Sequence, residues 1–189
     1  MKRWVLAATI WALAACGQTQ APKAADDAPP AAVESGEGQR LALVVGVGRY
    51  RAEIGALDNP ARDAGLVADA LRARGFAVTP LIDPDKRALT AALNTFASEL
   101  ESAGKDAVGL IYFAGHGMQV HGVNYVLPRD AEPPGGLSKD SPPRVVEDAL
   151  SDAFLPADRL LRALGQRENG VNILILDASA LPRLICCRR

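Results

Sequence analysis

The chain has 189 residues, 49% of them hydrophobic, and its 21 Lys and Arg against 22 Asp and Glu give a formal net charge of −1. Such a length leaves room for one ordinary domain. Balanced charge and an aromatic content of 5% argue against nucleic-acid binding, which needs a basic surface and, for single strands, aromatic side chains that stack on bases. We therefore expect one globular domain and no nucleic-acid partner.

The first residues, MKRWVLAATIWALAAC, are typical of a bacterial export signal. A basic start precedes an apolar run from Trp4 to Ala15, too short to span a bilayer but suited to a signal peptide. The end of this run, LAAC, resembles the bacterial lipobox, whose cysteine is lipidated and becomes the new N-terminus. We therefore predict a signal peptide at 1–15 and a lipid anchor on Cys16. Ordinary cleavage after Ala14, which would leave the cysteine free, is the alternative.

Residues 16–39 are predicted to form a flexible tether after the lipidated cysteine. They are rich in Ala, Pro, Gly and acidic residues, and such a composition cannot bury enough surface to fold. Gly17 rather than Asp follows the cysteine, so we expect the protein in the bacterial cell envelope, on the periplasmic face of the outer membrane. Only Cys186 and Cys187 then remain, and adjacent cysteines rarely pair, so no disulfide framework is predicted.

From Arg40 onward, strand-like and helix-like segments alternate. Buried strands are expected from apolar runs at 41–47, 76–82, 107–115 and 171–176. Helices are expected from amphipathic spacing at 59–75 and 85–104, and more weakly at 147–165 around Pro156. A hairpin is expected at 118–128, before a loop that covers about 128–144. This alternation predicts an α/β fold, a mainly parallel sheet with helices on both faces.

In such sheets the chemistry lies outside the carboxyl ends of the strands. The four strands end near Gly48-Arg49, at Asp83, at His116 and at Asp177-Ala178-Ser179. His116 stands between two glycines, which allow close approach of the backbone, whereas a packed core histidine would stand inside the apolar run. We therefore interpret His116 as a general base or acid.

Three other kinds of site are disfavoured by spacing. His121 is the second and last histidine, and no Cys or His cluster accompanies the pair, so no metal is predicted and His121 is assigned to a solvated hairpin. GVGRYR has Arg51 where the dinucleotide fingerprint needs its last glycine. Ser179 lies between Asp177 and Leu181, where the serine-hydrolase elbow has glycines. We expect no cofactor.

Four blocks of the sequence resemble the caspase and metacaspase family of cysteine peptidases. They are LALVVGVGRY, LDNPARDAGLVADALRARGF, GLIYFAGHGMQVHGVNYVLPRDA and ILILDAS, in the family's order and spacing over about residues 40–179. The resemblance implies a three-layer caspase-like fold over 40–179. It also implies an endopeptidase that acts on peptide or protein substrates.

The resemblance also assigns roles to individual residues. His116 matches the catalytic histidine, and Ser179 stands at the position of the nucleophilic cysteine. The backbone N–H groups of Gly117 and of residue 179 match the oxyanion hole. Asp63 and Asp177 match acids of the primary specificity pocket in metacaspase-like enzymes, which cut after Arg or Lys. Without the resemblance, Asp63 would be an ordinary acid favoured by the dipole of a helix N-terminus.

The chain departs from the family in two respects. Ser179 replaces cysteine, and a hydroxyl is far less acidic than a thiol. The sequence also provides only the first four of the family's six strands, and the tail at 180–189 resembles nothing in the family. A frameshift near the cysteine codon is our hypothesis for both departures. We expect an endopeptidase domain that is inactive in this chain; the alternatives are a pseudoenzyme that binds peptide or protein partners and a serine-using hydrolase.

Overall fold

The computed structural model describes residues 38–138, 140–165 and 170–180. The predicted signal peptide at 1–15, the lipidation site Cys16, most of the tether and the tail from residue 181 lie outside the described residues. Within the described ranges, no helix has the length and apolar character needed to cross a membrane.

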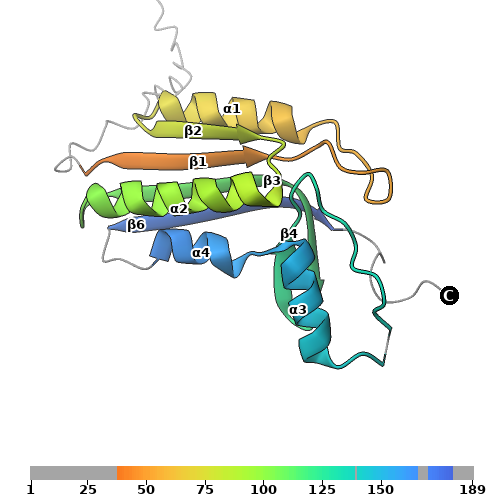
Figure 1. Cartoon of the computed structure of the whole chain (residues 1–189). Coiled ribbons are helices and arrows are strands. Elements are labelled where there is room, and N and C mark those ends of the chain that lie inside the picture. Colours follow the sequence, from red (N-terminus) through yellow and green to blue (C-terminus); the bar gives the residue numbers. More distant parts are fainter. Residues whose placement is uncertain (1–37, 139, 166–169, 181–189) are drawn as a thin grey trace, which may run out of the picture. The chain divides into compact units, whose positions relative to one another are not determined.

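A six-stranded sheet forms the centre of the described part of the chain (Figure 1). Its strands are β1 (Arg40–Gly46), β2 (Ala77–Ile82), β3 (Val108–Val120), β4 (Val123–Val126), β5 (Leu155–Pro156) and β6 (Val171–Ala180). Strands β2, β1, β3 and β6 lie side by side in this order, and each pair is parallel. The α/β class with a mainly parallel sheet, predicted from the alternation of elements, is therefore confirmed.

Strand β3 is longer than the sequence predicts, and it continues through His116 to Val120. Its second half pairs antiparallel with β4 across the turn His121-Gly122, whose residues have φ of 48° and 84°. Two consecutive positive φ values are what a type I′ hairpin turn requires. The predicted hairpin and the exposed position of His121 are thus confirmed. The short strand β5, which pairs with β4, was not predicted.

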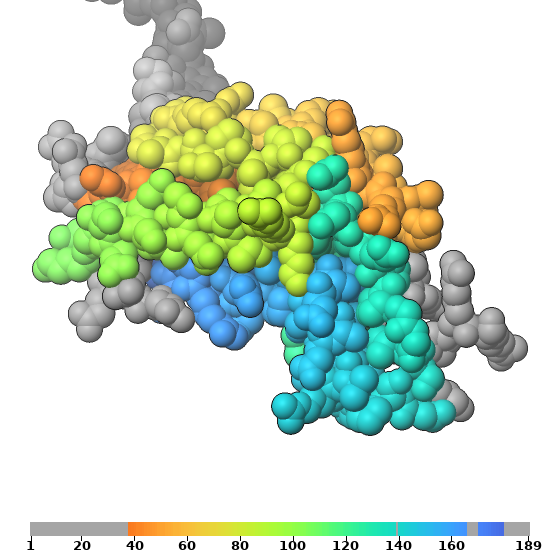
Figure 2. Space-filling model, in the orientation of Figure 1, coloured from red at the N-terminus to blue at the C-terminus, as the bar shows by residue number. Residues whose placement is uncertain are grey.

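Helices cover both faces of the parallel sheet. They are α1 (Pro60–Arg72), α2 (Lys86–Ser102), α3 (Pro143–Ala153) and α4 (Asp158–Gly165). Ala64 and Ala68 of α1 pack on one face, against side chains that include Val44 and Leu110. On the other face, α2 and α4 contribute leucines and Phe96 to the larger core. In Figure 2 the side chains of α2 and α4 hide most of β1 and β3 from view.

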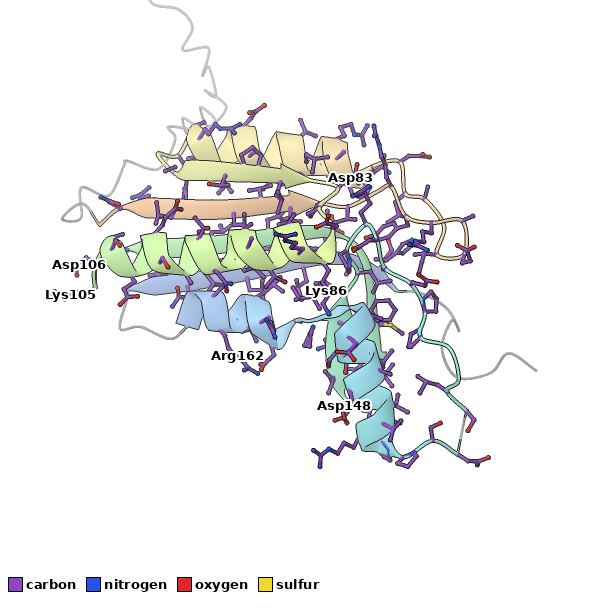
Figure 3. The ribbon with its side chains drawn as sticks, viewed as in Figure 1. Asp83, Lys86, Lys105, Asp106, Asp148 and Arg162 are labelled. Atoms are coloured by element: carbon purple, nitrogen blue, oxygen red, sulfur yellow. The ribbon has the colours of Figure 1, made fainter. Side chains whose placement is uncertain are left out.

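A lysine ties α3 to α2 where the two helices meet. Lys86, in the first turn of α2, donates from Nζ to the carbonyl oxygens of Ser151 at 2.6 Å and Asp152 at 2.8 Å (Figure 3). These carbonyls lie at the C-terminal end of α3, where a cation is favoured by the helix dipole. The predicted weak helical region at 147–165 consists of two helices, α3 and α4, and β5 with Pro156 lies between them.

Strand β6 lies at an edge of the parallel sheet. Within the described ranges it pairs with β3 alone. Three of its apolar residues are about half exposed: Val171 at 50%, Ile175 at 43% and Leu176 at 40%. An exposed apolar edge of this kind can pair with another chain.

Packing of α1 on the sheet depends on a glycine at the end of β1. A Cβ on Gly46 would lie 2.5 Å from the carbonyl oxygen of Pro60 and 2.9 Å from the Cβ of Ala64. Since the first neighbour is backbone, α1 would have to move away from the sheet. We expect Gly46→Ala to lower the free energy of unfolding by about 1–3 kcal/mol, measured by urea denaturation.

Gly65 provides the matched control, because it lies in α1 itself and a Cβ there would meet no atom within 4 Å. Gly65→Ala should raise the free energy of unfolding by about 1 kcal/mol, since alanine favours the helix. A Gly46→Ala protein as stable as the unmodified chain would contradict the packing described above.

Candidate active site at the carboxyl ends of the strands

The pairing of β3 with β6 brings the two central residues of the predicted site together. In the parallel register His116 lies directly opposite Ser179, and Ala114 lies opposite Asp177. Residues that pair across neighbouring strands point to the same face of the sheet, and successive residues alternate between faces. His116, Ser179 and Asp177 therefore share the face on which Ala114 packs with α1.

The imidazole of His116 is held by a backbone carbonyl. The residue is 8% exposed, and its Nε2 lies 3.0 Å from the carbonyl oxygen of Gly55. A carbonyl oxygen can only accept a hydrogen bond, so Nε2 carries the proton in the neutral ring, and Nδ1 is left with a lone pair. Nδ1 is buried and has no hydrogen-bond partner among the described residues. Among the described residues, no group donates a hydrogen bond to this ring nitrogen.

Tyr50 fixes the backbone around this histidine. Its hydroxyl accepts the backbone N–H of His116 at 2.8 Å and donates to the carbonyl oxygen of Leu127 at 3.2 Å. The two rings lie 4.7 Å apart at 50°. Burial raises the pKa of Tyr50 far above its usual value, so the hydroxyl stays protonated at neutral pH. A Cβ on Gly115 would lie 2.5 Å from this hydroxyl oxygen, which explains the need for glycine before His116.

A cavity of about 200 Å³ lies beside Ser179. It is lined by Leu57, Asp58, Asn59, Pro60, Asp63, Ala114, Gly115, Asp177 and Ser179. Asp63 comes from the first turn of α1 and Asp177 from β6, so the structure places both predicted pocket acids in one cavity. Asp58 is a third carboxylate, which the sequence analysis missed. None of the lining residues is basic, and the pairing of Asp63 with Arg62 at 3.6 Å involves an arginine that is 70% exposed.

One of the pocket acids is held by a buried tyrosine. The hydroxyl of Tyr112 donates to Oδ2 of Asp177 at 3.1 Å, and Tyr112 is 5% exposed. Burial, and then the hydrogen bond to this carboxylate, raise the pKa of Tyr112 to about 12. The tyrosine therefore stays a donor throughout the neutral range and fixes one oxygen of Asp177. The only signal for it in the sequence is a phenol inside an otherwise apolar strand.

The predicted oxyanion-hole residue Gly117 lies in β3, one position beyond the histidine. It is paired with Val126 of β4 and with Ala180 of β6. A Cβ at Gly117 would lie 2.9 Å from the Cβ of Ala178, so glycine permits the close approach of the two strands here. The role of its N–H group, and of the N–H group of residue 179, stays a prediction.

The described residues contain no group of three or more His, Cys, Asp or Glu side chains placed to hold a metal ion. His121 lies in the exposed turn at the far end of the hairpin and takes no part in the site.

Comparison with known proteins identifies the family. Residues 39–184 match the family described as the caspase domain. The mucosa-associated lymphoid tissue lymphoma translocation protein 1 of Homo sapiens and its Mus musculus homolog are each 28% identical to this chain over 138 residues, 73% of its length. The matched region spans only 15% and 14% of those two proteins.

A solved structure supports the fold. The crystal structure of a protein from Geobacter sulfurreducens resembles this one with a TM-score of 0.54 at 20% sequence identity, covering 74% of this chain and 50% of that one. At this identity the likeness concerns the fold alone. The family match covers most of the chain, from residue 39 to residue 184, and this range includes His116 and Ser179: the chain belongs to the caspase domain family.

Proposed function

We propose that the domain binds peptide or protein segments through a basic side chain, and that this chain, with serine at position 179, does not cleave them efficiently. The underlying activity is that of a cysteine endopeptidase, which the family implies. One observation carries the proposal: His116 lies opposite Ser179 in the sheet, and Ser179 lines a cavity that three aspartates also line.

The cavity favours arginine or lysine. Its volume of about 200 Å³ suits one side chain, and Asp58, Asp63 and Asp177 all line it. A guanidinium presents several donors in one plane and pairs well with carboxylates, and an ammonium is attracted by the same negative charge. A neutral or acidic side chain would leave these carboxylates without a charged partner.

The surroundings of His116 suit a thiol better than a hydroxyl. When the imidazole accepts a proton at Nδ1 it becomes a cation, and the group on its Nε2 is the neutral carbonyl of Gly55. Serine peptidases place a buried carboxylate there, which stabilises the imidazolium. A thiol, with a pKa of about 8.5, transfers its proton to imidazole far more readily than an alcohol does. This argues against a serine-using hydrolase.

The second candidate is a pseudoenzyme that binds peptide or protein partners at the cell envelope. The specific observation in its favour is that the acid-lined cavity is present beside a residue unsuited to attack. Both candidates predict binding of basic segments by this chain. They differ in whether cleavage appears when cysteine stands at position 179.

A first prediction concerns charge recognition in the cavity. A peptide with arginine should bind the chain at least about tenfold more tightly than the same peptide with citrulline, its neutral isostere, because hydrogen bonds to charged groups contribute about 1.5–3 kcal/mol. Asp63→Asn and Asp177→Asn should each reduce this preference, as measured by calorimetric titration. Asp69→Asn, on an exposed part of α1 that pairs with Arg72, is the control. Equal binding of the two peptides would contradict the proposal.

A second prediction concerns reactivity at position 179. The unmodified chain should not hydrolyse Arg or Lys peptides above background. In Ser179→Cys, the thiol should react with iodoacetamide at least about tenfold faster than an ordinary cysteine, because the neighbouring imidazole accepts its proton. Addition of His116→Ala should remove this advantage. Mass spectrometry of the tryptic peptide 168–183 isolates the site, since that peptide contains neither Cys186 nor Cys187.

The reactivity experiment can fail in two ways. If Ser179→Cys reacts at the same rate with and without His116, the histidine is not the base. If the unmodified chain already hydrolyses an arginine substrate and Ser179→Ala stops this hydrolysis, Ser179 is a nucleophile. The proposal that the chain does not cleave peptides efficiently would then be wrong.

The proposal includes anchoring of the domain at the envelope through a lipid on Cys16, as the lipobox-like segment indicates. Cys16→Ala should move the protein from the membrane fraction of expressing bacteria to the soluble fraction, whereas Cys186→Ala should not. Immunoblotting of the two fractions measures the change. Membrane association that survives Cys16→Ala would overturn the anchoring proposal and leave the peptide-binding proposal untouched.

A further inference from the structure

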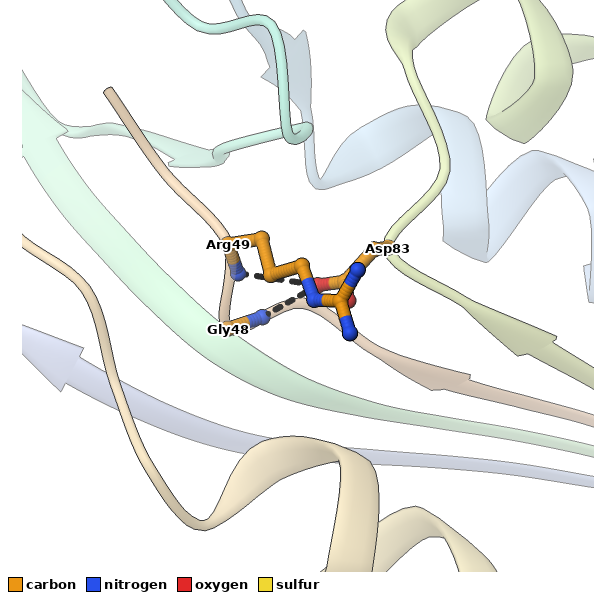
Figure 4. A network of polar contacts seen from close by, with 3 residues as sticks. All are labelled: Gly48, Arg49 and Asp83. Carbon is orange, nitrogen blue, oxygen red and sulfur yellow. Dashed lines mark hydrogen bonds and ion pairs between the residues drawn. The ribbon is translucent and has the colours of Figure 1, made fainter.

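Asp83, at the end of β2, holds the loop that follows β1 (Figures 3 and 4). Its Oδ1 accepts the backbone N–H groups of Gly48 at 2.7 Å and Arg49 at 2.9 Å. Its Oδ2 lies 3.5 Å from Nε of Arg49, but the arginine side chain is 87% exposed, whereas that of the aspartate is 13% exposed. An exposed ion pair contributes little, so the two charge-assisted hydrogen bonds to the backbone are the strong part of this contact.

The backbone of Asp83 is itself unusual. Its φ is 49°, in the left-handed region that glycine, asparagine and aspartate adopt more readily than other residues. Its own N–H donates to the carbonyl oxygen of Gly46 at 2.8 Å, directly after the ladder between β1 and β2. This conformation turns the carboxylate toward Gly48 and Arg49 rather than along β2. Strain of this kind persists where the surroundings hold it, often near functional sites.

Gly48 and Arg49, whose N–H groups bond to Asp83, form the base of the loop that follows β1 and contacts His116. The carbonyl oxygen of Gly48 accepts the N–H groups of Tyr50 at 3.1 Å and Leu57 at 2.9 Å, which closes the loop. From this base the loop contacts the histidine at two points: through the hydroxyl of Tyr50 on its backbone and through the carbonyl of Gly55 on its ring. A displacement of Gly48 and Arg49 would therefore change the positions of both the Tyr50 hydroxyl and the Gly55 carbonyl relative to His116.

Other polar contacts of the loop are weaker anchors. Arg51 pairs with Glu132 at 3.0 Å, but their side chains are 53% and 68% exposed, and such a pair contributes little. Within the loop, the N–H groups of Ile54 and Gly55 both donate to the carbonyl oxygen of Arg51 at 3.0 Å, and the side chains of Tyr50 and Ile54 pack in the larger core. These contacts hold Gly55 relative to Arg51, and the hydrogen bond to Asp83 holds the backbone N–H of Arg49, two residues before Arg51.

We propose that Asp83 is a positioning residue that determines the tautomer of His116. By holding Gly48 and Arg49 it places the carbonyl of Gly55 on Nε2, which keeps the proton on that nitrogen and leaves Nδ1 free to accept one. The inference deepens the proposed function and rests on it, since a base at Nδ1 matters only if His116 serves the residue at position 179. Asp83 touches neither the imidazole nor the substrate cavity.

Three variants separate positioning from stability. Asp83→Gly removes the carboxylate and suits the left-handed backbone, so the fold should survive. Asp83→Asn keeps an oxygen that can accept both N–H groups. Asp85→Ala is the control, because Asp85 caps α2 by accepting the N–H of Ala88 at 2.7 Å. Loss of this cap should lower stability, two residues from Asp83, without touching the loop.

The readout is the ¹⁵N spectrum of the histidine rings in the full chain, at a pH well above the ordinary histidine pKa of about 6.5. The chain has two histidines, and His121→Gln assigns the signals. His116 of the unmodified chain should show a protonated Nε2 and an unprotonated Nδ1. In Asp83→Gly both signals should move toward each other, as the tautomer protonated at Nδ1 gains at least about tenfold in population. Asp83→Asn should restore the original spectrum.

The same spectra contain the outcomes that overturn the proposal. A folded Asp83→Gly protein with unchanged ring signals would do so, as would an equal change in Asp85→Ala. If Asp83→Gly does not fold, amide hydrogen exchange of Gly48 and Arg49 in the unmodified chain decides. Slow exchange supports the two hydrogen bonds to Asp83, and exchange as fast as that of unpaired amides refutes them. Neither measurement uses residue 179 or a peptide. Failure of the positioning role of Asp83 is therefore distinct from failure of the proposed function, which the alkylation of Ser179→Cys tests.

Discussion

The parallel register between β3 and β6 is the constraint on which the site depends. It places His116 opposite Ser179 and Ala114 opposite Asp177, so the candidate base, the residue at the nucleophile position and a pocket acid share one face. A slip of one residue would turn Ser179 and Asp177 to the opposite face. The glycines on either side of His116 allow close contacts here: a Cβ on Gly115 would meet the hydroxyl of Tyr50, and a Cβ on Gly117 would meet Ala178 of the neighbouring strand β6. The motif around the histidine is thus a packing requirement as well as a chemical one.

The site divides into a neutral part and an acidic part. Around His116 the described contacts are the carbonyl oxygen of Gly55 and the hydroxyl of Tyr50, which stays protonated, so neither contact carries a charge. The carboxylates lie instead in the adjacent cavity, where Tyr112 fixes Asp177. Among the described residues, the uncharged contacts of the ring are thus separate from the carboxylates that line the cavity. This separation gives a reason to expect poor reactivity of a hydroxyl at position 179, since no carboxylate among the described hydrogen-bond partners of His116 would stabilise an imidazolium.

The sequence predicts what depends on residue type, and fails where conformation decides. Apolar runs locate β1, β2 and β6, and amphipathic spacing locates α1 and α2 to within a few residues. His116 is visible because a histidine between glycines after an apolar run is unusual, whereas Asp63 and Asp177 were identified only through the family resemblance. The carbonyl of Gly55 could not be predicted, because every residue has a carbonyl and only the loop conformation aims this one. Tyr50 and Tyr112 were missed for a related reason, since each acts through a partner distant in sequence. Asp58 was missed because only the fold brings it to the cavity.

The Nδ1 atom of His116, which has no hydrogen-bond partner among the described residues, bears on whether this histidine has a chemical role. A buried polar atom without a hydrogen-bond partner costs about 1–3 kcal/mol, and folded proteins rarely leave one without a reason. The described residues provide Nε2 with a carbonyl and the backbone N–H with a phenol, yet they leave Nδ1 without a partner. A histidine kept only for packing would be replaced by an apolar residue at little loss. The proposal that Nδ1 accepts the proton of the group at position 179, which lies opposite His116, gives this unpaired atom a role.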